Sequence, residues 1–285
     1  MINSNELCLP LCLPFACFVA DSSKVEQTGI TFTHYFAEMF LVQEGTPRMT
    51  LEKEELILEP GDVVMVCPGT RHRITAAEDE MFRMIVLRID PDRVPTFPDY
   101  APDLKSILAE ARRVHAPMRM PAEEAERRGL PTLFAQCVYE DKERQYGYDM
   151  GITDCLGILC LTMVRFWMAR GVNLPSRKAQ VPPIYSLSAY IQSHLGDGLR
   201  VEDLAEYCGL SYPWFAKKFR EVYGVSCKDY IEQIRVARVE QFLRFTDLDL
   251  AEISDVNGYA DCSHMIKNFK RIMGITPGQY RQQLR

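Results

Sequence analysis

Two groups of basic side chains near the C-terminal end of the chain are of the residue types that bind phosphate. The groups are Lys217, Lys218 and Arg220, and then Lys267, Lys270 and Arg271. Each group is expected to lie on one helix, so that its charges gather on a helix face and contact a nucleic-acid backbone. The alternative is a solvated helix face, and Lys218 and Arg271 fit that alternative equally well.

The elements that would carry these groups form a repeat. Residues 204–210 align with residues 253–259, and four further positions align with their counterparts: Phe219, Gly224, Ser226 and Tyr230 with Phe269, Gly274, Thr276 and Tyr280. Each unit indicates a short helix, a glycine turn, a second helix and a glycine stop, which is the pattern of a helix-turn-helix. A pair of such units presents two helices to successive major grooves, so the repeat predicts binding to double-stranded DNA.

Capping residues predict where these helices begin. We expect helices over 201–208 and 212–223, the second capped by Ser211, and a helix over 262–273 capped by Asp261. Asp249 and Glu252 resemble a capping box, and Thr276 starts a closing helix at Pro277. Between the units, Ser226 would cap a connecting helix over 227–244, which at 1.5 Å per residue is roughly 27 Å long.

Helical spacing divides each second helix into a core face and a face available to DNA. The predicted core residues are Phe215, Phe219 and Val222 in the first unit, and Met265, Phe269 and Ile272 in the second. The predicted DNA-facing residues are Tyr212, Pro213, Ala216, Lys217 and Arg220, and then Cys262, Ser263, Ile266, Lys267 and Lys270. Phosphate contacts would supply salt-dependent affinity, and the other outward side chains would read bases.

This C-terminal segment resembles the AraC-type family of transcription factors over about residues 184–285. The motif elements are residues 201–205 and 208–211, Phe219, Gly224, residues 234–237, residues 274–277 and Tyr280-Arg281. Arg200 departs from the family pattern, because a Ser or Thr cap is usual there, and Ser254 and Asn257 replace apolar residues. We therefore expect the second helix-turn-helix to be less stable or less tightly engaged than the first.

The first hundred residues predict a β domain. Alternation over residues 31–40 would place Phe32, His34, Phe36, Glu38 and Phe40 on one strand face. Further short strands are expected at 63–66 and 81–89, separated by turns rich in proline and glycine. Many short strands at this spacing favour a sandwich or barrel.

This domain resembles a cupin barrel, which many AraC-type regulators use to bind a small effector. The matching residues are His34-x3-Glu38-x6-Gly45, Pro60-Gly61-Asp62 and Pro68-Gly69-x2-His72. The resemblance implies effector contacts from Phe32, His34, Phe36, Glu38 and His72. Metal-binding cupins use one more histidine, and Phe32 occupies its place, so His34, Glu38 and His72 would remain as two imidazoles and one carboxylate able to form a facial metal site. Metal binding, effector contact and a purely structural polar group stay open.

Helices are expected between these two parts, over 103–115, 130–146 and 149–170. The last has large apolar residues at helical spacing, among them Ile152, Leu156, Leu159, Met163 and Phe166. This stripe either packs on the chain's own barrel or forms a dimer. Residues 172–183, which are polar and contain prolines, are expected to be a linker.

Composition excludes several classes of protein. The chain has 285 residues, 47% hydrophobic and 25% charged, which is typical of a soluble protein with two cores. Residues 181–285 hold 13 Lys or Arg and 13 Asp or Glu, so the net charge of −6 belongs to the first 180 residues. The ten cysteines include no C-x-x-C pair and are expected to be reduced. The apolar run over 7–20 contains Pro10 and Pro14 and lacks a basic start, so we expect strands there and no membrane segment or signal peptide.

The sequence thus predicts an α+β protein of two domains, with an N-terminal cupin-like β-barrel flanked by helices and a C-terminal all-α double helix-turn-helix. The expected boundaries are 1–100 for the effector-sensing barrel, 101–171 for a helical dimerisation segment, 172–183 for the linker and 184–285 for the DNA-binding domain. The expected function is a cytoplasmic, homodimeric transcription regulator, an activator in contact with RNA polymerase, that responds to a small molecule such as a sugar. No catalytic residue, cofactor or enzymatic activity is expected. The alternatives are a metal-dependent cupin enzyme fused to a DNA-binding domain and a DNA-binding regulator that needs no effector.

Overall fold

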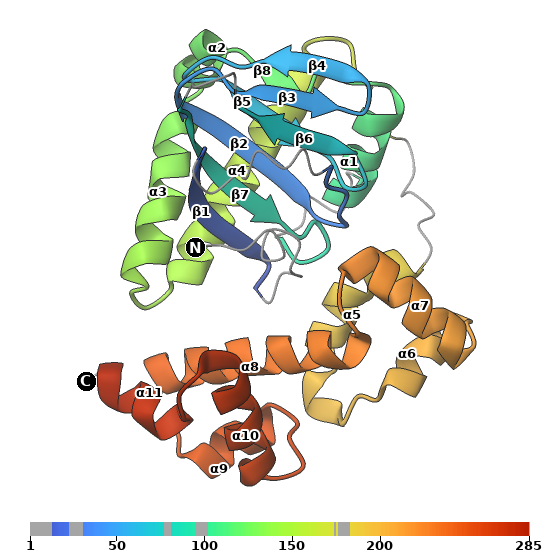
Figure 1. The fold of residues 1–285 in the computed structure, drawn as a ribbon, viewed down its shortest axis with the longest axis vertical. Coiled ribbons are helices and arrows are strands. Elements are labelled where there is room, and N and C mark those ends of the chain that lie inside the picture. The colour runs from blue at the N-terminus through green and yellow to red at the C-terminus, as the bar shows by residue number, and fades with distance from the viewer. Residues whose placement is uncertain are drawn as a thin grey trace. The chain divides into compact units, whose positions relative to one another are not determined.

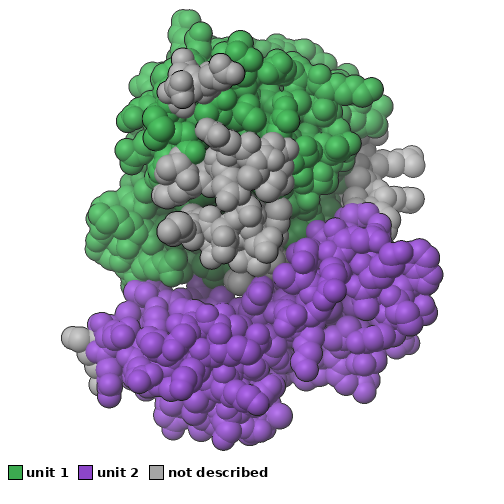
Figure 2. All heavy atoms as spheres, in the orientation of Figure 1, with its two compact units in different colours: residues 1–180 green, residues 181–285 purple. Residues whose placement is uncertain are grey.

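The computed structural model describes residues 13–22, 31–76, 81–94, 102–173, 175 and 183–284. The chain divides into two units, residues 1–180 and residues 181–285 (Figures 1 and 2). The division falls inside the segment predicted as a linker, most of which lies outside the described residues. The first part of the predicted apolar run, residues 7–12, also lies outside them.

The N-terminal unit contains two antiparallel sheets. The strands are β1 (Phe15–Asp21), β2 (Ala37–Glu44), β3 (Arg48–Leu51), β4 (Glu54–Ile57), β5 (Val63–Val66), β6 (His72–Thr75), β7 (Arg83–Ile89) and β8 (Arg119–Met120). The larger sheet has the order β1-β7-β2-β5-β8 and the smaller has the order β4-β3-β6. The predicted β-rich cupin-like fold is therefore confirmed.

Both faces of the larger sheet are buried. Phe40, Val64 and Val86 point inward and pack with Met49 and Leu51 of the smaller sheet. The alternate residues, such as Met65, are equally buried, on the face that α3 contacts through β1 and β7. Burial on both faces explains why the central strands are continuous apolar runs that do not alternate with polar residues.

Three predictions about this unit differ from the structure. The alternation over residues 31–40 does not form one strand, because β2 begins only at Ala37 and Phe32 instead makes an isolated bridge to His72. Segment 101–171 is not purely helical, since β8 lies within it and pairs with β5. Strand β7 also begins two residues later than predicted, at Arg83.

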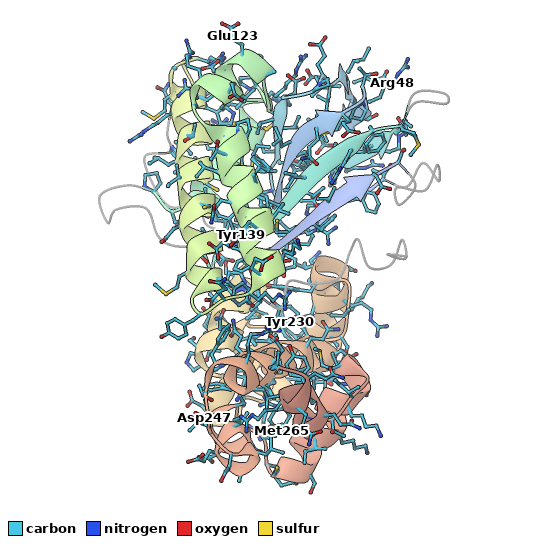
Figure 3. The ribbon with its side chains drawn as sticks, turned by 90° about the vertical axis from the view of Figure 1, so that its left-hand side faces the viewer. Arg48, Glu123, Tyr139, Tyr230, Asp247 and Met265 are labelled. Atoms are coloured by element: carbon cyan, nitrogen blue, oxygen red, sulfur yellow. The ribbon has the colours of Figure 1, made fainter. Side chains whose placement is uncertain are left out.

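Four helices complete the described part of the unit: α1 (Leu104–Arg113), α2 (Ala122–Arg127), α3 (Leu130–Glu143) and α4 (Tyr148–Met168). Asp103 caps α1 by accepting a hydrogen bond from the backbone N–H of Ser106. Helices α3 and α4 pack side by side as a hairpin beside the sheets (Figure 3). Among the described residues α4 alone is long and apolar enough to cross a membrane, yet half of its apolar window is buried within the protein.

The C-terminal unit is helical. It contains α5 (Leu187–Ser193), α6 (Val201–Tyr207), α7 (Tyr212–Tyr223), α8 (Cys227–Phe245), α9 (Leu250–Val256), α10 (Cys262–Met273) and α11 (Pro277–Leu284), with 3₁₀ turns at Pro183–Ser186 and Leu195–Asp197. The repeat is visible in the backbone. Leu210 N–H donates to the Ala205 carbonyl and Tyr259 N–H to the Ser254 carbonyl, around glycines with φ of 63° and 66°. Both turns are thus the same helix stop, with Gly209 and Gly258 in the left-handed region.

The predicted caps are mostly confirmed. The side chains of Ser226, Asp249 and Asp261 accept backbone hydrogen bonds at the starts of α8, α9 and α10. Ser211 stands at the N-cap of α7 but makes no capping hydrogen bond with its side chain. At Arg200 the missing Ser or Thr is compensated, because the Asp203 carboxylate accepts the Arg200 backbone N–H at 3.1 Å.

Each helix-turn-helix has its own core. In the first, the stacked rings of Phe219 and Tyr223 lie 4.3 Å apart, and Phe215 is fully buried beside them. Val222, predicted for this core, is only half-buried, and Tyr223 takes its place one full turn after Phe219. The core of the second unit includes Met265 and Phe269 as predicted, with Ile272 packed against it and half-buried.

Candidate functional site

Lysines occupy the same position on the second helix of each helix-turn-helix. Lys217 is the sixth residue of α7 and Lys267 is the sixth residue of α10, and both side chains are exposed. Arg220 and Lys270 follow three residues later and are also exposed. The repeat therefore displays paired positive charges on two structurally equivalent helices.

The N-terminal end of α8 lies between these two helices. One surface hollow is lined by Lys217 and Arg220 of α7, and another by Lys267 and Arg271 of α10. Ser226 and Lys228 line both hollows, so the two hollows belong to one continuous surface. Lys228 was not predicted to contact DNA. It lies two residues after Ser226, the cap of the connecting helix, so its positive charge adds to the end of the helix dipole that already favours an anion.

Neighbouring lysines on α7 have different surroundings. The Lys218 ammonium forms an ion pair with the Glu221 carboxylate at 3.1 Å, which raises the pKa of Lys218. The Lys217 ammonium instead lies 5.5 Å from the ring centroid of Trp214, a geometry for cation–π attraction. Trp214 is 61% exposed, so it is a further candidate contact that helical spacing alone did not indicate.

The remaining predicted contacts fall into two sets. Tyr212, Pro213 and Ser263 are exposed, and Ala216 is half-buried. Cys262 and Ile266 are half-buried, as Ala216 is. Both pack partly against the core of the second unit, where the Cys262 thiol lies 3.6 Å from the Leu250 carbonyl oxygen.

The second unit also buries polar groups where apolar ones were expected. Ser254 and Asn257 are buried, and the Asn257 amide donates to the Ile253 carbonyl at 2.7 Å. Its Oδ1 atom has no hydrogen-bond partner among the described residues. An unpaired buried acceptor costs about 1–3 kcal/mol, which agrees in direction with the predicted lower stability of this unit.

In the barrel, a buried polar cluster forms where the two sheets meet. Glu38 of β2 lies directly opposite Arg88 of β7 in the strand register, and Arg88 Nε donates to Glu38 Oε1 at 2.9 Å. Glu38 Oε2 is 3.0 Å from His34 Nε2 and 3.1 Å from His72 Nε2. The structure thus brings together the three predicted residues and adds Arg88, which the sequence did not predict.

Backbone carbonyls hold both imidazole rings. His34 Nδ1 lies 2.8 Å from the Phe36 carbonyl oxygen, and His72 Nδ1 lies 3.1 Å from that of Thr70. In each ring Nδ1–H therefore donates to a carbonyl, and Nε2 points at the Glu38 carboxylate. A neutral ring would direct its Nε2 lone pair at that oxygen, so the arrangement requires a positive species between them, either a proton or a cation.

The cluster shifts the protonation of its members. Burial alone would raise the pKa of Glu38, but the charge and hydrogen bond of His34, the hydrogen bond of His72 and the charge of Arg88 outweigh it and hold that pKa well below its usual range. Burial alone would lower the pKa of His72, but the hydrogen bond and charge of Glu38 raise it overall. The site therefore favours an ionised carboxylate beside a protonated His72.

A small cavity of about 40 Å³ adjoins the cluster. Its described lining is largely apolar, including Phe18, Phe32, Phe40, Ile74 and Met84, with His34, Glu38, His72 and Arg88 as the polar members. Phe36, predicted to contact an effector, does not line this cavity. Its ring stacks on His34 at 3.8 Å and lies 5.3 Å from the Arg88 guanidinium, so it supports those two side chains.

Two families of known proteins match the chain. A helix-turn-helix domain family matches residues 204–283, which contain α7 and α10. A cupin domain family matches residues 24–88, which contain Glu38, His72 and Arg88. Each match covers one of the two candidate sites.

The curated relatives are regulators. The Msm operon regulatory protein of Streptococcus mutans is 35% identical over 109 residues, which are 38% of this chain and 38% of that protein. The HTH-type transcriptional activator RhaR of Klebsiella pneumoniae is 22% identical over 253 residues, which are 89% of this chain and 87% of that protein. The match spans less than two fifths of the length of the Msm operon regulatory protein and of the regulatory protein PocR of Salmonella typhimurium. Among solved structures, ToxT from Vibrio cholerae is 16% identical with a TM-score of 0.43, covering 95% of this chain and all of that one.

Proposed function

Since the chain carries an AraC-type helix-turn-helix domain and a cupin domain, as its sequence predicted, we propose that it regulates transcription by binding double-stranded DNA in response to a small molecule. The observation that carries this proposal is the pairing of exposed Lys217 and Lys267 on two equivalent helices of one surface. Phosphate contacts from such a surface give affinity that falls as salt rises. The relatives are regulators, and RhaR is an activator by name, which supports activation. The helix-turn-helix domain supports a cytoplasmic site of action, where the DNA would be.

Selection of bound duplexes from a random DNA pool tests the DNA-binding part. The full chain is expected to enrich a sequence with two recognition elements one helical turn apart, because each helix-turn-helix contacts its own major groove. Affinity for the enriched duplex should fall steeply between low and moderate salt. Enrichment of no sequence would count against this function.

Replacing Lys217 with alanine is expected to weaken binding to the enriched duplex about tenfold and to reduce the slope of log affinity against log salt by about one. Lys218→Ala is the matched control, because Glu221 already engages the Lys218 ammonium. Fluorescence anisotropy over a salt series measures both variants. Equal losses in the two would show that the groove placement of Lys217 is wrong.

The effector of this regulator is proposed to bind beside Glu38 and Arg88. The described cavity has room for only a few water molecules, so a sugar would enter only if the surrounding Phe and Met side chains moved. A small, mainly apolar molecule with one polar group fits the lining better. Thermal-shift screening of metabolites against the full chain tests this, since a ligand selective for the folded state raises its stability. No shift from any compound would favour a regulator that needs no effector.

The geometry of the cluster also favours a second candidate, in which the barrel holds a divalent metal. Ligand bonds of about 2.1 Å at right angles separate ligand atoms by about 3.0 Å, close to the two distances from Glu38 Oε2. The donor types suit such a metal: His34 Nε2, His72 Nε2 and Glu38 Oε2 lie within 4.8 Å of one another, and the two carbonyls fix the rings. A bound metal could polarise a substrate oxygen, which is the basis of the enzymatic alternative.

Metal analysis distinguishes this candidate from the first. If the barrel is a metal site, the purified chain is expected to hold one Fe, Mn or Zn per protomer, and His72→Ala is expected to lose it. Stoichiometric metal that survives in His72→Ala would place the metal elsewhere. A metal-free protein that still binds DNA would favour an effector site or a structural role for the cluster.

Homodimerisation is also part of the proposal. The α3–α4 hairpin leaves large apolar side chains exposed, among them Tyr139 on α3 and Met150 on α4 (Figure 3 labels Tyr139). A regulator with two protomers would place two DNA-binding units on one operator. Sedimentation of the full chain over a concentration series measures this directly.

A further inference from the structure

The imidazole of His264 is exposed on α10 and yet is held in place by its neighbours. His264 is the third residue of α10, the position that Trp214 has on α7, and it lines the same surface hollow as Lys267. Its Nε2 atom lies 3.0 Å from Asn268 Nδ2. Its ring packs edge to face with the ring of Tyr259, with 5.6 Å between the centroids. Contacts on two sides therefore restrict this exposed ring.

A buried carboxylate behind Asn268 determines which nitrogen of the imidazole carries the proton. Glu232 Oε2, on α8, accepts a hydrogen bond from Asn268 Nδ2 at 2.6 Å. Because a carboxylate only accepts, the amide must present its nitrogen on this side, and the second hydrogen of Nδ2 is available to His264 Nε2. A Nε2 atom that accepts this hydrogen carries no proton. The proton of the neutral ring therefore lies on Nδ1.

The carboxylate that begins this chain of hydrogen bonds is itself fixed. Arg235 Nη1 donates to Glu232 Oε1 at 3.3 Å, and the Arg235 guanidinium lies 5.4 Å from the centroid of the Tyr259 ring. Glu232, Arg235 and Asn268 are all buried between α8 and α10, which pack against each other (Figure 1). A specific contact requires such support behind the contacting side chain, whereas a solvated side chain does not.

The Nδ1–H group of His264 is left available to a ligand. Among the described residues, no atom accepts a hydrogen bond from it. It lies near the start of α10, and the first residues of a helix in the major groove are the ones that contact base edges. In that groove every purine presents its N7 atom as an acceptor, whereas cytosine presents a donor. A single N–H of fixed direction therefore suits a purine.

We propose that His264 recognises a purine by donating its Nδ1–H to the N7 atom of the base, and that Asn268 and Glu232 are positioning residues that set its tautomer. This inference rests on the DNA binding in the proposed function and adds a base contact to it. A phosphate would be bound more strongly by a charged donor, such as the exposed ammonium of Lys267, than by a neutral N–H. The neutral, oriented donor therefore favours a base edge.

Nuclear magnetic resonance of the full chain without DNA tests the tautomer. With ¹⁵N-labelled histidine at mildly alkaline pH, the nitrogen chemical shifts of His264 should show the proton on Nδ1, and the spectrum of His264→Ala identifies its signals. Asn268→Ala should let the ring exchange between both tautomers. Glu232→Gln should keep the wild-type tautomer, because the glutamine carbonyl still accepts from Asn268. A wild-type ring with its proton on Nε2 would overturn the proposal.

Base analogues test the contact with the purine. Each purine of the enriched duplex is replaced in turn by its 7-deaza analogue, which has C–H in place of N7. One replacement should weaken wild-type binding roughly fivefold, the effect of losing one hydrogen bond, and should weaken binding by His264→Ala no further. Trp214→Ala, the change at the equivalent position of α7, is the matched control and should stay sensitive to that replacement.

Fluorescence anisotropy gives these affinities, and circular dichroism checks that each variant is folded. A folded Asn268→Ala chain should lose most of its sensitivity to the same 7-deaza purine, which a merely structural role would leave unchanged. Normal wild-type binding to every 7-deaza duplex, with a loss at one methylphosphonate that His264→Ala abolishes, would assign His264 to a phosphate and overturn the proposal. The resonance experiment needs no DNA, so failure of the tautomer and failure of DNA binding are separable.

Discussion

Glu38→Ala is expected to destabilise the N-terminal unit by about 3–5 kcal/mol, the typical cost of removing one partner from a buried ion pair. Arg88 is 6% exposed, so its guanidinium would remain buried without a carboxylate, and His72, which is 3% exposed, would lose the partner that raises its pKa. In a unit of this size the melting temperature should fall by roughly 10 °C. Urea unfolding gives the free energy directly.

The two tryptophans of the chain allow the unit to be observed by itself. Trp167 is 1% exposed in the N-terminal unit and Trp214 is 61% exposed in the C-terminal unit. In a Trp214→Phe background, the fluorescence of Trp167 therefore reports unfolding of the barrel unit alone. The double variant Glu38→Leu/Arg88→Met should lose less stability than Glu38→Ala, because no unpaired charge stays buried. A loss below about 1 kcal/mol in Glu38→Ala would show that the cluster is not a buried ion network.

The same cluster sets the pH dependence of barrel stability. Glu38 has a lowered pKa, so its contribution is complete above about pH 4.3 and is lost as the pH falls through the folded-state pKa. His72 has a raised pKa, so its contribution is complete below about pH 6.5 and is lost as the pH rises through the folded-state pKa. Stability should therefore be greatest between these limits and decline above about pH 6.5. Glu38→Ala should remove the alkaline decline, because Glu38 is what raises the pKa of His72.

The helical half could be predicted closely because its determinants are local. Helices α7 and α10 have the predicted bounds, since each is fixed by its N-cap position, its apolar spacing and a left-handed glycine at its end. The exposure of Lys217 and Lys267 follows from the same spacing. Cys262 and Ile266 are half-buried, because the exposure of positions at the edge of a helix face depends on the neighbouring helix, here α9.

The barrel site depends on long-range pairing, which spacing does not reveal. Arg88 lies opposite Glu38 because of the register of β2 with β7. The two residues are 50 positions apart in the chain. The available indication was Arg88 among the buried apolar residues of β7, because a buried strand tolerates such a charge only opposite a counter-charge. The alternation over residues 31–40 was misleading, because His34 reaches the cluster from the chain before β2.

Gly209 and Gly258 occupy equivalent turns in the repeat, yet their surroundings differ. A Cβ atom on Gly209 would have no neighbour within 4 Å among the described residues. A Cβ atom on Gly258 would overlap the backbone carbonyl oxygen of Leu195, a buried residue in the 3₁₀ turn Leu195–Asp197. The second helix-turn-helix therefore packs closely against that turn, which is possible because Gly258 has no side chain.

Alanine at these two positions is therefore expected to have unequal effects. Gly209→Ala adds only left-handed backbone strain of about 1–2 kcal/mol. Gly258→Ala adds a backbone overlap that must be relieved by moving α9, a further cost of about 1–3 kcal/mol. Hydrogen exchange measured by mass spectrometry should show α9 and α10 opening more often in Gly258→Ala, by a larger factor than α6 and α7 in Gly209→Ala.

DNA affinity should follow the same order, because moving α9 displaces α10 and its Lys267 and Lys270 from the shared surface. Gly258→Ala is expected to lose the contribution of the second recognition element, so that its affinity for the full duplex approaches its affinity for a duplex with the first element alone. Gly209→Ala should keep a preference for the full duplex, since its turn accommodates the added methyl group. Equal exchange and equal affinity in the two variants would mean that the contact of Gly258 with Leu195 does not position the second helix-turn-helix.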